Sequence, residues 1–242
     1  MKVRNGTTAS KLLIKWIGSL KHIQEVTFIQ YELVPSARRR SVPDLGQYQV
    51  ILKKQRVRGP IWIPDYEVAV AAQHRDWGRS LEIWANVARH DTNPENRYRI
   101  PVSRDKINTE YIKALQRERK GYVLAVSSLV RIESGHERHI PMMDFQCPVE
   151  DALYLDYLIA GLKSFAPAPG VILDSGRSYH YYGCALLTSE EWRKFLGQCL
   201  LLVPLTDIRY VGHRLFDGEC VLRIGQDPEH PKVPRVVRSL RS

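Results

Sequence analysis

The stretch that decides the fold is Val171–Gly183, which reads VILDSGRSYHYYG. Its first residues, Val171–Leu173, form an apolar run typical of a buried strand, and a second strand-like run covers Tyr179–Leu187. Between the two runs, Asp174–Gly176 has the composition of a tight turn, because glycine tolerates a positive φ and Asp and Ser side chains bond to the local backbone. The stretch therefore predicts a β-hairpin.

The predicted turn brings a cation, a hydroxyl and an imidazole to one rim of the hairpin, from Arg177, Ser178 and His180. These three groups suit a bound phosphate better than a hydrophobic core. The alternative is an ordinary surface hairpin whose histidine is satisfied by neighbouring protein groups. Taken by itself, the local sequence favours this alternative.

Length and composition are those of a globular protein. The chain has 242 residues, of which 44% are hydrophobic and 26% charged, enough for one large domain or two small ones that share a core. No apolar run approaches the roughly 20 residues of a membrane-spanning helix. Lys11, Lys15 and Lys21 interrupt the N-terminal apolar residues, so no signal peptide is indicated. We expect a cytoplasmic protein without membrane association.

The four cysteines are scattered and form no Cys-x-x-Cys pair. This spacing argues against a disulfide scaffold and against a cysteine-rich zinc site. We expect buried thiols in a reducing compartment. They are Cys147, Cys184, Cys199 and Cys220.

The net charge of +10 is carried by the N-terminal half. Residues 1–120 contain 23 Lys and Arg against 12 Asp and Glu, whereas residues 121–242 contain 13 against 14. A basic half is suited to a polyanion, because neutralised phosphates release counterions; the alternative is a solvated basic face. The expected nucleic-acid contacts lie in and after the predicted loop at 36–45, at Arg38, Arg39, Arg40, Lys53, Lys54, Arg56 and Arg58.

Hydrophobic periodicity predicts an α+β fold, with an antiparallel or mixed sheet backed by helices. Expected helices cover residues 11–20, 107–119, 150–165 and 188–201. Expected strands cover residues 24–34, 48–52, 122–132, 139–145, 207–211 and 219–224, in addition to the hairpin. Residues 65–90 fit either a helix or a strand, and the tail at 228–242 is rich in proline and basic residues.

Three short stretches of the C-terminal half now fall in line: PMMDFQ at Pro141–Gln146, SGRSYH at Ser175–His180 and LTD at Leu205–Asp207. In this order they resemble the motifs of archaeo-eukaryotic primases and primase-polymerases. In that family the first motif is an apolar strand with Asp-x-Asp, the second is Ser-x-His, often preceded by Ser-Gly-Arg, and the third is an apolar residue followed by Asp. The second match is the specific one.

The resemblance implies an RRM-like primase palm over residues 121–242, beside a basic N-terminal α/β lobe over residues 1–120 that forms one compact unit with it. It implies that Asp144 and Asp207 are catalytic carboxylates that bind Mg²⁺ or Mn²⁺. The residues it implies for the phosphates of a nucleoside triphosphate are Arg177, Ser178, His180 and, by a weaker match, Arg223. Asp144 and Asp207 each have an ordinary alternative as a turn or capping acid.

One position departs from the family pattern, since Gln146 stands where the second acid of the first motif is expected. A neutral amide is a poorer ligand for a hard cation than a carboxylate. Phosphoryl-transfer sites of this type use carboxylates to hold two metal ions. The departure therefore predicts a single-aspartate member with weak, altered or no polymerase activity.

Three functional hypotheses remain open at this point. The first is a metal-dependent nucleotidyltransferase that makes or extends primers on a DNA or RNA strand. The second is a catalytically degenerate binding or partner subunit, which Gln146 favours, working with a helicase or another replication or defence subunit. The third is an unrelated α+β domain with a chance Ser-x-His, which predicts no nucleotide binding and fails if Asp144, His180 and Asp207 converge on one cleft.

Overall fold

The computed structural model describes residues 3–20, 22–32, 97–119, 121–150, 152–166, 169–226 and 231–240. Residues 1–33 and 94–242 belong to one compact unit, and the description below concerns that unit. The features predicted between residues 36 and 90 lie outside the described residues. The same is true of the predicted nucleic-acid contacts, Arg38, Arg39, Arg40, Lys53, Lys54, Arg56 and Arg58.

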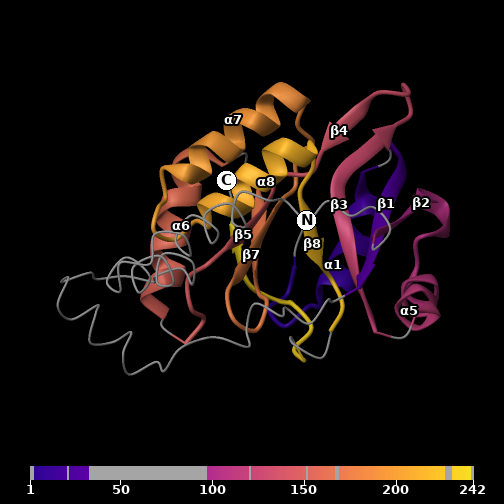
Figure 1. Cartoon of the computed structure of the whole chain (residues 1–242), viewed down its shortest axis with the longest axis horizontal. Helices are drawn as coiled ribbons and strands as arrows, with labels where there is room; N and C mark the ends of the chain where they lie inside the picture. Colours follow the sequence, from indigo (N-terminus) through magenta and orange to yellow (C-terminus); the bar gives the residue numbers. More distant parts are fainter. Residues whose placement is uncertain are drawn as a thin grey trace, which may run out of the picture. The chain divides into compact units, whose positions relative to one another are not determined.

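Two antiparallel sheets form the centre of this unit (Figure 1). The first has the order β2-β1-β3-β4, with β8 also paired to β3. Its strands are β1 (Ile23–Glu32), β2 (Arg97–Ser103), β3 (Tyr122–Ile132), β4 (Glu137–His139) and β8 (Val221–Arg223). The second sheet has the order β5-β7-β6-β9. Its strands are β5 (Met142–Phe145), β6 (Gly170–Asp174), β7 (Tyr179–Gly183) and β9 (Arg235–Leu240).

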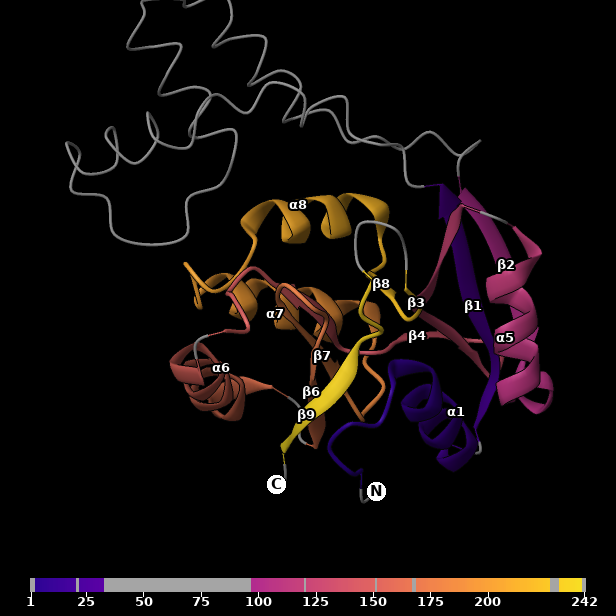
Figure 2. The same cartoon turned by 90° about the horizontal axis from the view of Figure 1, so that it is seen from below.

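Helices flank both sheets, and this confirms the expected α+β class. Figure 2 shows α1 and α5 beside the first sheet, with α6 and α7 beside the second. The helices are α1 (Ala9–Ser19), α5 (Thr109–Glu118), α6 (Ala152–Phe165), α7 (Ser189–Leu200) and α8 (Ile208–Asp217), with a 3₁₀ turn at Arg104–Lys106. No helix in the described part of the chain is long and apolar enough to cross a membrane.

The predicted hairpin is confirmed as β6 and β7, which pair antiparallel from Gly170↔Gly183 to Asp174↔Tyr179. The turn is closed by a bond from the Ser175 amide to the Ser178 carbonyl (2.9 Å) and by the Asp174 carboxylate, which accepts from the Gly176 amide (2.6 Å). Gly176 has φ +106°, a conformation that other residues rarely adopt. All of β7 is buried.

Two further predicted elements are confirmed with close boundaries. β3 covers the predicted 122–132, and it pairs with β1, which lies before residue 120 in the chain. The predicted start of the helix at 188–201 is confirmed by a capping box: the Thr188 side chain accepts from the Glu191 amide, and the Glu191 carboxylate accepts from the Thr188 amide.

The strand predicted at 139–145 is wrong as a single element. His139 ends β4 in the first sheet, where it pairs with Leu129, whereas Met142 begins β5 in the second sheet, where it pairs with Tyr182. The chain crosses from one sheet to the other at Ile140 and Pro141. Because of this crossing, the end of β5 lies where residues of both sheets meet.

The strand predicted at 207–211 is also wrong, because Asp207 instead precedes α8. Its carboxylate Oδ1 accepts from the Tyr210 amide (3.2 Å), which is the bond of a helix N-terminal cap. Val211 is buried whereas Ile208 is 58% exposed, as expected for two positions on different sides of a helix. Apolar β-branched residues at both positions gave the misleading strand pattern.

Other differences concern the sheet edges and one helix face. β2 and β9 were not predicted as strands; both are edge strands, where proline and charged residues are tolerated. Leu153 of α6 is 52% exposed, although it is an apolar residue of a helix that packs on the core. All four cysteines are free thiols, three of them buried.

Candidate active site

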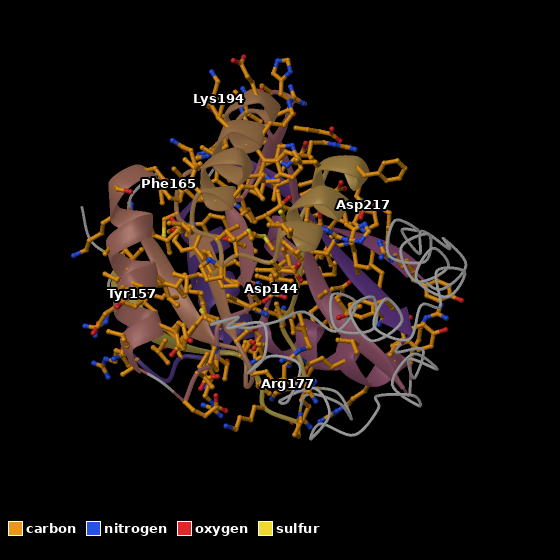
Figure 3. All side chains as sticks on the ribbon, turned by 60° about the vertical axis from the view of Figure 1, so that its left-hand side comes forward. Asp144, Tyr157, Phe165, Arg177, Lys194 and Asp217 are labelled. Atoms are coloured by element: carbon orange, nitrogen blue, oxygen red, sulfur yellow. The ribbon has the colours of Figure 1, made fainter. Side chains whose placement is uncertain are left out.

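A cavity of about 150 Å³ lies where the two sheets meet. One wall comes from β5, β7 and the hairpin turn, and the opposite wall comes from β1 and β8. In Figure 3, Asp144 is labelled near the middle of the molecule and Arg177 lies nearer its edge. The lining residues are Tyr31, Asp144, Ser175, Arg177, Ser178, His180, Val221, Leu222 and Arg223. The cavity therefore unites the first two predicted motifs.

Three predicted site residues meet at one carboxylate oxygen. Asp144 and His180 are direct cross-strand partners on β5 and β7, so their side chains lie on the same face of the sheet. Ser178 Oγ donates to Asp144 Oδ1 (3.3 Å), and His180 Nε2 lies 3.6 Å from the same oxygen. The imidazole is 5% exposed, so β5 and β7 fix its position.

The surroundings of Asp144 disfavour its charged form. Burial, followed by the negative charge of Asp207, raises the pKa of Asp144 to about 7, against the opposing effects of the Ser178 hydrogen bond, Arg223 and Arg214. Solvent still reaches 39% of the Asp144 side chain, because this residue lines the cavity. Near neutral pH the carboxyl group is therefore partly protonated, and a cation would compete with that proton.

Asp207 lies close enough to act on Asp144 electrostatically, although it is not part of the cavity wall. Its place follows from a bridge between Phe145, at the end of β5, and Thr206. The predicted alternative role of Asp207 is also present, since its side chain caps α8. The structure thus places Asp144 and His180 in one cavity wall, with Asp207 near Asp144 but outside that wall.

Arg223 is a buried cation that is hydrogen-bonded to the backbone of the hairpin turn. Its guanidinium donates to the backbone carbonyls of Ser175 (2.6 Å), Gly225 and Lys232 (2.9 Å). The arginine is 7% exposed and reaches the cavity wall, where its charge lowers the pKa of Asp144. Arg177, on the turn itself, is exposed. Arg223 and Arg177 thus both line the cavity, where Arg223 is buried and Arg177 is exposed to solvent.

Comparison with known families agrees with this arrangement. A family model described as archaeo-eukaryotic primase 1D-like matches residues 105–235, which is more than half of the chain and includes all three motifs. The chain belongs to the archaeo-eukaryotic primase-like family. No curated protein and no solved structure matches the chain significantly.

The primase-like palm therefore contains the hairpin, both aspartates and Arg223. The matched residues begin after β2 and end at the start of β9. β1, which supplies Tyr31 to the cavity, lies outside the match. The predicted division at residue 120 stays a prediction, and the sheet that holds β1 and β3 spans this position.

The palm offers few metal ligands. Among the described residues, no three His, Cys, Asp or Glu side chains converge in a way that would hold a metal ion. Gln146, at the position of the expected second acid, donates from its amide nitrogen to the carbonyls of Pro204 (3.0 Å) and Thr206 (3.3 Å). The two carboxylates that interact are thus Asp144 and Asp207.

Four residues of the cavity wall were not predicted as site residues: Tyr31, Val221, Leu222 and Ser175, the last of which was expected only as part of the turn. Tyr31 belongs to a strand that was predicted, but the local pattern does not tell which side of that strand meets the second sheet. Val221 and Leu222 were expected only as residues of the strand predicted at 219–224. Long-range packing decides which parts of these strands border the cavity.

Proposed function

We propose that the primase-like palm binds a nucleoside triphosphate together with a divalent metal ion and acts on a DNA or RNA strand. The observation that carries the proposal is the convergence of Asp144, Arg177, Ser178 and His180 on one cavity between the two sheets. A cation, a hydroxyl and an imidazole beside a carboxylate fit a metal–triphosphate better than an apolar or cationic ligand.

Each residue of the hairpin has a distinct part in this proposal. Arg177 contacts phosphate oxygens as the exposed cation, with Ser178 as a hydroxyl donor. His180 provides imidazole Nε2, which lies 3.6 Å from Asp144 Oδ1, as a further hydrogen-bonding group beside the carboxylate. Arg223 contributes its positive charge and fixes the turn, since its N–H groups bond to backbone carbonyls.

Asp144 and Asp207 would hold Mg²⁺ or Mn²⁺. The fit rests on their proximity: after burial, the charge of Asp207 is the second cause that raises the pKa of Asp144, and a cation near both carboxylates would offset that repulsion. Two carboxylates leave most of the ligand positions of a hard cation to water and phosphate oxygens. When bound, the metal neutralises charge on the transferred phosphoryl group.

A second candidate function is a binding subunit without polymerase activity. Gln146 favours it, because a carboxylate at this position would be needed for the usual pair of metal ions. In that case the palm retains nucleotide binding, while a helicase or another replication or defence subunit supplies the chemistry. Both candidates share the nucleotide site and differ in primer synthesis.

Calorimetric titration of GTP and dGTP, with and without Mn²⁺, tests the shared site. We expect Mn²⁺-dependent binding by the wild type and a loss of the Mn²⁺ dependence in Asp144→Asn. Asp156→Asn is the matched control, because Asp156 is exposed on α6. Absence of binding by the wild type under all conditions would overturn the proposal.

A primer-synthesis assay then separates the two candidates. The wild type is incubated with a single-stranded template, labelled nucleotides and Mn²⁺, and Asp144→Asn serves as the background. Product above that background supports the nucleotidyltransferase. Binding without product supports the binding subunit.

A further inference from the structure

Gln146 joins the first motif to the segment that carries Asp207. Its side-chain nitrogen donates to the carbonyl oxygens of Pro204 (3.0 Å) and Thr206 (3.3 Å). Its backbone amide donates to the carbonyl between them, that of Leu205 (2.9 Å). One residue thus bonds to three consecutive carbonyl groups immediately before Asp207.

The same segment is held from its other side by α7. The Thr206 hydroxyl donates to the Cys199 carbonyl in the last turn of that helix (2.6 Å), and Thr206 is completely buried. Phe145 forms a β-bridge with Thr206. Asp207 follows this segment directly and caps α8. Its position is therefore set by the contacts that residues 145 and 146 make with residues 204–206.

The contacts of Gln146 require a hydrogen-bond donor. Both acceptors are backbone carbonyl oxygens, and the amide nitrogen has two N–H groups to meet them. An ionised Asp or Glu has only acceptor oxygens and would face two carbonyl dipoles of the same sign. An ionised acid of the family pattern thus could not make the two side-chain bonds that Gln146 donates to residues 204 and 206.

We infer that Gln146 is a positioning residue for Asp207, and that restoring an acid at this position weakens the metal site instead of adding a second metal. The inference rests on the proposed function, since it assigns Asp207 to metal binding. It opposes the view that Gln146 is a weakened ligand left from an Asp-x-Asp pair. The two views predict opposite effects of the same substitution.

The test is a Mn²⁺ titration at saturating GTP, with free Mn²⁺ followed by electron paramagnetic resonance. We expect Gln146→Glu to weaken Mn²⁺ binding about tenfold, as the loss of a residue that orients a ligand commonly does, without a second bound ion. Gln146→Met, which keeps the length of the side chain but has no donor, should weaken it to a similar degree. Gln198→Glu is the charge-matched control, because Gln198 is exposed on α7.

Tighter Mn²⁺ binding by Gln146→Glu, or two ions bound per chain, would overturn the inference. Unchanged affinity in Gln146→Met would do so as well, because the donor role would then be without effect. Circular dichroism checks that each variant is folded.

Hydrogen exchange of the metal-free protein gives a readout independent of nucleotide binding. The amides of residues 205–211 should exchange faster in Gln146→Glu and Gln146→Met than in the wild type and in Gln198→Glu. If the wild type binds neither Mn²⁺ nor GTP, the proposed function fails, while faster exchange still shows that Gln146 holds this segment. Unchanged exchange in both variants would overturn the positioning role.

Discussion

Asp144 receives opposite influences from its neighbours. Packing and the charge of Asp207 favour its protonated form, whereas Ser178, Arg223 and Arg214 favour the carboxylate. The effects of burial and of Asp207 are the larger ones, so the pKa of Asp144 is raised and its ionised form is disfavoured in the absence of a cation. A residue whose ionisation is disfavoured in this way, inside a cavity, is typical of a functional site.

Asp144→Asn should stabilise the metal-free protein at neutral pH but not in acid. The folded protein keeps this proton up to about pH 7, whereas the unfolded chain releases it near pH 4. Stability therefore falls as the pH rises through that window, and the neutral amide removes the loss. Because solvent reaches the carboxylate, we expect a gain of only about 1–2 kcal/mol at about pH 8.

Urea unfolding of both proteins at about pH 4 and pH 8 measures this difference. The gain should appear at the higher pH and vanish at the lower one. An equal effect at both pH values would show that the pKa of Asp144 is not raised in the folded protein.

Arg177→Ala should lower the affinity for Mn²⁺–GTP by about 10- to 100-fold, which corresponds to the loss of a hydrogen bond to a charged group. The exposed position of Arg177 means that stability should hardly change. Arg193→Ala, on the exposed face of α7, is the control, and calorimetry gives both affinities. An affinity unchanged from the wild type would remove Arg177 from the site.

At the scale of elements, the capping box of α7 is a local feature whose contribution is testable. Thr188→Ala removes the acceptor for the Glu191 amide and should lower the free energy of unfolding by about 1 kcal/mol. Thermal unfolding measures the loss. Ser164→Ala is a suitable control, because Ser164 is exposed in the last turn of α6, where its hydroxyl bonds only within that helix. An equal loss of unfolding free energy in both variants would show that the capping box does not contribute specifically to stability.

Elements with local signals were predictable, and elements that depend on partners were not. The hairpin and α7 carry turn and cap residues in their own sequence, and β3 has a long apolar run. β9 has no comparable signal, because it is a strand only by pairing with β6. Asp207 misled for a related reason, since the residues after it have side chains that suit a strand or one side of a helix.

The candidate site was predictable to the same extent. The sequence order of the motifs identified Asp144, Ser178 and His180, which the structure brings together. The structural use of Gln146 and Arg223 could not be inferred, because both bond to backbone carbonyls of residues distant in the chain, Pro204 and Ser175 respectively. Because every residue has a backbone carbonyl, the sequence does not indicate which residues accept such a bond.

At the scale of the whole molecule, the two halves differ in charge and the basic half contains the predicted nucleic-acid contacts. Replacing Arg38, Arg39 and Arg40 together by Ala should weaken single-strand binding. It should also reduce the slope of log affinity against log salt by about 2, at roughly 0.7 per phosphate contact. Fluorescence anisotropy of a labelled oligonucleotide at several salt concentrations measures both.

A triple replacement of exposed cations in the palm, Lys163, Arg193 and Lys194, provides the control of equal charge. We expect its salt slope to stay close to that of the wild type. Equal reductions in both triple variants would mean that net charge, and not residues 38–40, governs binding.

The bonds of Arg223 have a consequence for how this molecule opens. Carbonyls from the hairpin turn, from the residues after β8 and from the segment before β9 all meet one buried guanidinium. If the segment before β9 detached, the buried Arg223 guanidinium would lose one of its hydrogen-bond acceptors. Separating β9 from the turn therefore carries a free-energy cost. We therefore expect β9 and the hairpin turn to open together as one cooperative unit. The bonds of Arg223 to the carbonyls of Gly225 and Lys232 therefore also restrain the turn that lines the cavity.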